Sequence, residues 1–114
     1  MVDQEGREYI TPEIERRQYR RVQLITQVRC ETLSCDALLL TRDVSVGGLF
    51  IKSVRPLPAN SEVSLTFNLK PSEPAITCRG RVVYAVVGLG MGIQFSDLTE
   101  EARQVLQRFV DESV

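Results

Sequence analysis

Four arginines lie within six consecutive positions near the N-terminus: Arg16, Arg17, Arg20 and Arg21. Each guanidinium is a planar fork of N–H donors, and it binds two phosphate oxygens or the O6 and N7 atoms of guanine. Arg17 and Arg21 are four residues apart, which places them on one side of a helix or of an extended segment. The cluster therefore predicts a site for an anionic group. The alternative is a basic segment that faces water, as runs of charge usually do.

A second cluster follows in the segment Asp43-Val44-Ser45-Val46-Gly47-Gly48. A carboxylate accepts two parallel hydrogen bonds, and the Watson–Crick edge of guanine offers such a pair of donors. In an extended segment Ser45 lies on the same side as Asp43, and its hydroxyl can donate or accept. Gly47 and Gly48 allow positive φ and close approach of a ligand to the backbone. The alternative is an ordinary turn between strands, where Asp, Ser and Gly recur.

Taken together, the two clusters indicate a ligand that is anionic and also carries hydrogen-bond donors, as a guanine nucleotide does. The composition agrees with geometric recognition, because only Lys52 and Lys70 among the 14 basic residues are lysines. The net charge of −1 argues against a general nucleic-acid-binding protein. The aromatic content of 6% also offers few stacking platforms for single-stranded RNA or DNA.

The absence of histidine excludes Ser–His and Cys–His catalysis and removes the commonest nitrogen ligand of zinc. No carboxylate pair suited to acid–base chemistry is evident, so we expect no enzyme, no metal and no cofactor apart from the ligand. The cysteines Cys30, Cys35 and Cys78 show no CxxC spacing. Cys30 and Cys78 lie in apolar-alternating segments, which predicts buried free thiols.

The sequence contains no apolar run long enough to cross a membrane and no signal peptide, which predicts a cytoplasmic protein without membrane association. Its 114 residues suffice for one domain. We expect residues 1–15 to form a flexible N-terminal arm and residues 16–114 to form the folded domain.

Alternating apolar residues predict six strands, over residues 22–30, 37–41, 49–51, 63–69, 76–86 and 89–95. The second strand is expected to end at the Asp43 turn, and Gly80 is expected to permit a bend in the fifth. An amphipathic stripe predicts a helix over about 99–112, capped by Thr99 with Asp97 as a competing cap. Closure of six short strands removes exposed edges, so the fold class is an all-β, six-stranded antiparallel β-barrel with one C-terminal helix.

The ordered motifs RxxxR (Arg17 to Arg21) and DxSxxG (Asp43, Ser45, Gly48), followed by Gly90-Met91-Gly92-Ile93-Gln94-Phe95, resemble the PilZ family. The resemblance runs from about Glu15 through the C-terminal helix. It implies a non-enzymatic receptor for the bacterial second messenger cyclic di-GMP. The implied ligand residues are Arg17, Arg21, Asp43 and Ser45, with Gly47 and Gly48 in the turn. Ligand binding would order the arm and change a surface that contacts a protein partner.

Four further points remain open in the sequence. The resemblance implies that Arg16 contacts the second molecule of a stacked cyclic di-GMP dimer, whereas Arg20 can be solvated charge. Arg79 and Arg81 on the outward face of the fifth strand either line a site or keep the surface soluble. The alternative function is a PilZ-like adaptor that acts through protein contacts alone, without ligand. Downstream processes served by the family include motility and biofilm regulation, and the sequence names none of them.

Overall fold

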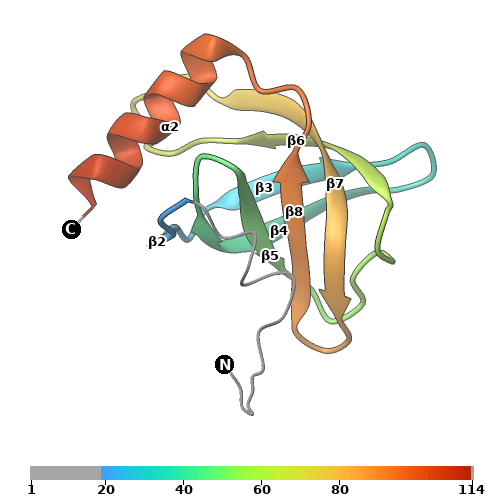
Figure 1. Ribbon diagram of the computed structural model, residues 1–114. Coiled ribbons are helices and arrows are strands. Elements are labelled where there is room, and N and C mark those ends of the chain that lie inside the picture. The colour runs from blue at the N-terminus through green and yellow to red at the C-terminus, as the bar shows by residue number, and fades with distance from the viewer. Residues whose placement is uncertain (1–18, 114) are drawn as a thin grey trace.

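A computed structural model describes residues 19–113, and its elements are labelled in Figure 1. The strands are β2 (Val22–Gln23), β3 (Gln27–Glu31), β4 (Asp36–Val44), β5 (Gly48–Lys52), β6 (Glu62–Phe67), β7 (Ile76–Val86) and β8 (Gly90–Phe95). The helix α2 spans Glu100–Glu112. The predicted arm, residues 1–15, lies outside the described residues.

Six of these strands close into an antiparallel barrel. Neighbouring strands follow the order β4-β3-β6-β7-β8-β5, and an additional pairing of β4 with β5 closes the sheet on itself. The short strand β2 pairs with the end of β4, with Val22 opposite Val44 and Gln23 opposite Asp43. The predicted six-stranded barrel is therefore confirmed, and closure leaves few unpaired backbone groups at sheet edges.

The predicted first strand, residues 22–30, is two strands instead of one. Val22, Leu24, Val28 and Cys30 are buried on one face, as the alternation predicts. The pairing is interrupted at residues 24–26 by the fully buried Thr41 of β4. Its hydroxyl donates to the carbonyl of Leu24 and accepts from the N–H of Thr26 at 3.1 Å. A side chain thus satisfies backbone groups that a continuous ladder would otherwise satisfy.

The other strands also differ slightly from their predicted limits. Strand β4 is longer than predicted and continues through Asp43 to Val44, so the aspartate lies in a strand and the turn follows it. Strand β7 has the predicted bounds. Its irregularity lies between Val82 and Tyr84, in the pairing with β8, rather than at Gly80.

Helix α2 lies outside the barrel at the end where β2 is found (Figure 1). Leu106 and Val110 are its buried residues and join the hydrophobic core. Thr99 is the N-cap, and its side chain accepts the N–H of Ala102 at 3.1 Å, as predicted.

The competing cap, Asp97, has another partner. It accepts the backbone N–H of Arg79 at 2.6 Å and the Arg79 Nε–H at 3.1 Å, and these bonds lower the pKa of its carboxyl. Asp97 therefore fastens the segment between β8 and α2 to strand β7.

The three cysteines are free, with Cys30 and Cys78 buried and Cys35 exposed, which confirms the predicted buried thiols. Burial raises the pKa of Cys30 to about 11 and that of Cys78 to about 12, above the ordinary value of 9.0. The buried thiols are therefore protonated and inert near neutral pH.

We expect a thiol-specific chromogenic disulfide at pH 8 to label Cys35 rapidly in the folded protein and the other two cysteines only after unfolding. Mass spectrometry of the labelled protein identifies the sites. Rapid labelling of three cysteines in the native protein would contradict the buried positions.

The raised pKa values also make stability depend on pH. Because both buried thiols have raised folded-state pKa values, their contribution to stability is fully present below pH 9.0 and is lost as the pH rises toward 11 and 12.

Substitution of Thr41 by valine keeps the volume but removes the hydroxyl that joins β4 to residues 24–26. We expect the free energy of unfolding to fall by about 1–3 kcal/mol, because buried backbone groups lose their partner. Chemical denaturation measures the change. Thr77→Val is the matched control, since Thr77 is exposed and its hydroxyl lies 3.4 Å from that of Thr66. Equal losses in the two variants would rule out the proposed role of Thr41.

Candidate functional site

A β-bulge in β4 places two successive side chains on the outer face of the barrel. Thr41 lies opposite Ile51 and Asp43 lies opposite Phe50, so one extra residue, Arg42, stands between the two pairs. Thr41 is buried, whereas Arg42 is exposed and Asp43 is half-buried. In regular pairing Arg42 and Asp43 would point to opposite faces. The bulge therefore allows the aspartate of the DxSxxG motif to face outward beside an arginine.

Asp43 joins the two sequence motifs through an ion pair. Its Oδ1 accepts a hydrogen bond from Nη1 of Arg21 at 2.7 Å, and its Oδ2 accepts one from Nε of Arg42 at 2.9 Å. The side chain of Asp43 is 17% exposed and that of Arg21 is 24% exposed, so the pair is partly shielded from water. Such charge-assisted bonds are stronger than neutral ones and fix the geometry of both groups.

The Arg21 guanidinium retains an unsatisfied donor. Its Nε is buried and has no hydrogen-bond partner within the described part of the chain. A buried N–H without an acceptor costs roughly 1–3 kcal/mol, so the described residues leave Arg21 incompletely satisfied. With Arg42 on the other side, two cations flank one carboxylate, so the described residues give this surface an excess of positive charge.

The turn after Asp43 is stabilised by Ser45 and not by the aspartate. Ser45 is buried, and its Oγ accepts the backbone N–H groups of Gly47 at 3.1 Å and of Gly48 at 3.2 Å. The ordinary-turn interpretation therefore fits Ser45. It does not fit Asp43, whose hydrogen-bond partners among the described residues are the two arginines.

The two glycines of the turn lie in close packing, and neither uses the positive φ that glycine allows. Among the described glycines, Gly88 has positive φ, and Gly47 and Gly48 do not. A Cβ at Gly47 would lie 2.7 Å from the ring of Tyr19, and a Cβ at Gly48 would lie 2.0 Å from the carbonyl oxygen of Ile93. The missing side chains thus allow the chain itself, rather than only a ligand, to approach the turn.

Arg42 is a residue that the sequence analysis missed. Its Cζ lies 3.8 Å from the centroid of the Phe50 ring, in a cation–π contact. The Phe50 ring lies over Gly90, where a Cβ would come within 2.6 Å of it, and packs against Tyr84 at 6.1 Å between centroids. The available signal was its position next to Asp43, although the bulge that turns it outward is a property of the pairing.

The other arginines singled out from the sequence fall into three groups. Arg16 and Arg17 lie outside the described residues, so their predicted roles are untested. Arg20 donates a hydrogen bond to the carbonyl of Ser113, which links the start of the described chain to the end of helix α2. Arg79 and Arg81 form exposed ion pairs with Asp97 and Glu62, in agreement with a surface role.

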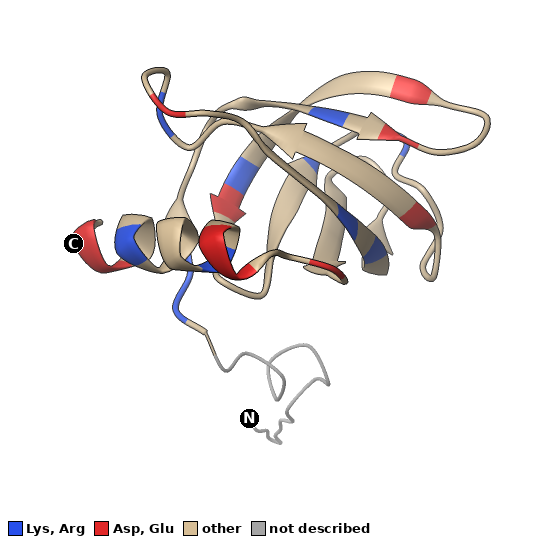
Figure 2. Cartoon of the chain, turned by 90° about the horizontal axis from the view of Figure 1, so that it is seen from above, with Lys and Arg blue, Asp and Glu red and all other residues tan. Residues whose placement is uncertain are grey.

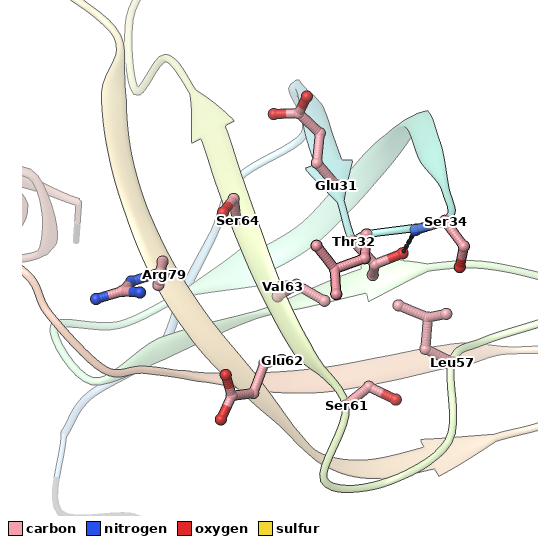
Figure 3. Close-up of a pocket in the computed structure, with 10 residues that line it drawn as sticks. Glu31, Thr32, Ser34, Leu57, Ser61, Glu62, Val63, Ser64 and Arg79 are labelled. Carbon is pink, nitrogen blue, oxygen red and sulfur yellow. Dashed lines mark hydrogen bonds between the residues drawn. The ribbon is translucent and has the colours of Figure 1, made fainter.

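An open hollow of about 730 Å³ lies elsewhere, lined by residues of β3, β6 and β7 and the loops beside them (Figure 3). Its lining includes the carboxylates of Glu31 and Glu62, with Arg79 at one side (Figure 3). Two carboxylates repel an anion. None of the residues predicted from the two motifs lines this hollow, so its size does not make it the candidate site.

Charge over the rest of the molecule is mixed. Figure 2 shows acidic segments at both ends of helix α2 with basic ones between them, and charges of both signs scattered over the strands. No group of three or more potential metal-ligating side chains occurs among the described residues. None of the helices in that part of the chain is long and apolar enough to cross a membrane.

Solved structures share this fold. MotI/DgrA, the inhibitor of motility of Bacillus subtilis, matches with a TM-score of 0.75 and 17% identity over 84% of this chain and 50% of that one. The PilZ domain of YcgR from Escherichia coli, solved with c-di-GMP, matches with a TM-score of 0.68 and 14% identity, over 86% of this chain and 91% of that one. PlzA of Borreliella burgdorferi, in complex with c-di-GMP, matches with a TM-score of 0.64 and 14% identity, over 83% of this chain and 41% of that one.

This chain thus spans half the length of MotI/DgrA and less than half that of PlzA. A search of curated proteins found no significant match. The family model described as the PilZ domain matches residues 15–112, which include both arginine positions of RxxxR, the DxSxxG turn and helix α2. With the barrel and the joined motifs, this match establishes that the chain belongs to the PilZ domain family.

Proposed function

We propose that this chain is a non-enzymatic receptor for cyclic di-GMP. The observation that carries the proposal is the ion pair between Arg21 and Asp43, which unites the RxxxR and DxSxxG motifs at 2.7 Å. Two related structures, those of YcgR and PlzA, were solved with c-di-GMP. The excess of positive charge around Asp43 suits a ligand with two phosphates.

Each described residue has a distinct role in this proposal. Arg21 offers its remaining guanidinium donors to a phosphate or guanine oxygen, while Asp43 holds the guanidinium in place. A carboxylate has about four lone-pair sites, so Asp43 can accept guanine N–H groups in addition to the two arginines. Ser45, Gly47 and Gly48 shape the turn, and Arg17 supplies the second arginine of the clamp.

The signal would pass from the ligand to the helix. Arg20 lies beside Arg21 in the sequence and donates to the carbonyl of Ser113, at the C-terminal end of α2. Ordering of the arm by ligand costs about 1–2 kcal/mol per residue in backbone entropy, which charge-assisted contacts must offset. With Arg20 held in place, the arm and α2 would together form one surface, and an unidentified protein partner would bind there.

Replacement of Arg21 or Asp43 by alanine tests the clamp. Each change removes at least two charge-assisted contacts worth roughly 1.5–3 kcal/mol each, so we expect cyclic di-GMP affinity to fall by at least about 100-fold. Titration calorimetry measures the affinity, and circular dichroism verifies that the barrel remains folded.

The matched controls are Arg103→Ala and Asp36→Ala, which remove exposed charges of the same types. These variants should bind as the wild type does. Unchanged affinity in both clamp variants would refute the assigned site. A wild-type protein that shows no binding at all would favour the ligand-independent adaptor.

The ligand number tests the role of Arg16. If Arg16 contacts the second molecule of a stacked dimer, the wild-type protein binds two cyclic di-GMP molecules per chain and Arg16→Ala binds one. Calorimetric stoichiometry distinguishes the two cases, with Arg7→Ala as a control for loss of a basic residue outside the motif. If the wild-type chain binds one ligand, Arg16 does not have this role.

A further inference from the structure

We propose that Arg42 is a third arginine of the ligand site, whose guanidinium plane stacks on a guanine base of cyclic di-GMP. The inference rests on the proposed function and extends the site beyond the two motifs. It comes from the outer face of the barrel, where the β4 bulge brings Arg42 next to Asp43.

The first observation is that two contacts fix the orientation of Arg42. Its Nε donates to Oδ2 of Asp43 at 2.9 Å, and its Cζ lies 3.8 Å from the centroid of the Phe50 ring. Phe50 is itself buried, at 1% exposure. One face of the guanidinium therefore rests on a buried ring while one edge is held by the carboxylate, so the side chain has less conformational freedom to lose on binding.

The second observation concerns the way in which this aromatic surface is built. Phe50 and Tyr84 lie on either side of Gly92, since Phe50 pairs with Gly92 across β5 and β8 and Tyr84 pairs with Gly92 across β7 and β8. A Cβ at Gly92 would lie 2.3 Å from the Tyr84 ring, and a Cβ at Gly90 would lie 2.6 Å from the Phe50 ring. Because these glycines have no side chains, both rings pack flat against the sheet, and Arg42 can lie over Phe50.

The third observation is the exposure of Arg42. Its side chain is 46% exposed even though two contacts hold it. Within residues 19–113 its terminal nitrogens make no other hydrogen bond. Arginine planes stack on bases, and the donors at the edge bind base or phosphate oxygens. Arg42 lies next to Asp43, so the two residues can bind the same guanine. Asp43 would accept the N–H groups of its Watson–Crick edge, and Arg42 would stack on its face.

Two variants separate stacking from a purely electrostatic role. Arg42→Ala removes the plane and the charge, whereas Arg42→Lys keeps the charge and a donor for Asp43 but has no planar face. A stacking contact predicts that both variants bind cyclic di-GMP about tenfold or more weakly than the wild type. Arg29→Ala is the control, because the side chain of Arg29 is also 46% exposed and also pairs with an aspartate, Asp36.

Titration calorimetry with cyclic di-GMP gives the affinities, and thermal melting verifies folding. Weakened binding in both Arg42 variants, with an unchanged control, supports the inference. Wild-type affinity in either variant overturns it, and in Arg42→Lys it would show that charge and the positioning of Asp43 suffice. If Arg42→Ala fails to fold, the lysine variant decides. Absence of binding by the wild type would instead refute the proposed function, and this inference with it.

Discussion

The extra residue in strand β4 is the constraint on which the site depends. Strand β4 pairs with β2, β3 and β5, so it both closes the barrel and receives the segment that follows the arginine motif. The bulge between Thr41 and Asp43 lets Thr41 point inward, where it satisfies backbone groups of residues 24–26, while Arg42 and Asp43 point outward. A single irregularity of pairing thereby fixes both the entry of the chain into the barrel and the chemistry of its surface.

The charges around Asp43 illustrate how a partly shielded carboxylate organises its neighbours. Arg21 and Arg42 each occupy one of its oxygens, and both guanidinium groups are oriented before any ligand arrives. Among residues 19–113 the arrangement is unbalanced, with two cations for one anion and a buried Nε–H that lacks an acceptor. An anionic ligand would complete it. Exposed pairs such as Arg81 with Glu62 are balanced and contribute little, because water screens them.

The glycines of this barrel have different structural roles at different positions. Gly48 permits close approach of β8 to the DxSxxG turn, while Gly90 and Gly92 leave room for aromatic rings on the outer face. The turn itself is held by the Ser45 hydroxyl, which leaves Asp43 available for arginines. Arg20 connects this region to the end of α2. The DxSxxG turn, the segment around Arg20 and Arg21 and the helix are therefore neighbours through a small number of directed contacts.

The sequence by itself determined the barrel, because alternating apolar residues such as Val28 and Cys30 specify which face of each strand is buried. It also determined the capped helix and the two motifs, since these depend on local residue types. Only the tertiary structure decided that the first predicted strand divides at residues 24–26, that Asp43 lies within β4 and that Arg42 turns outward over Phe50. These features depend on strand register and on side chains distant in sequence, such as Thr41, which periodicity along one strand does not encode.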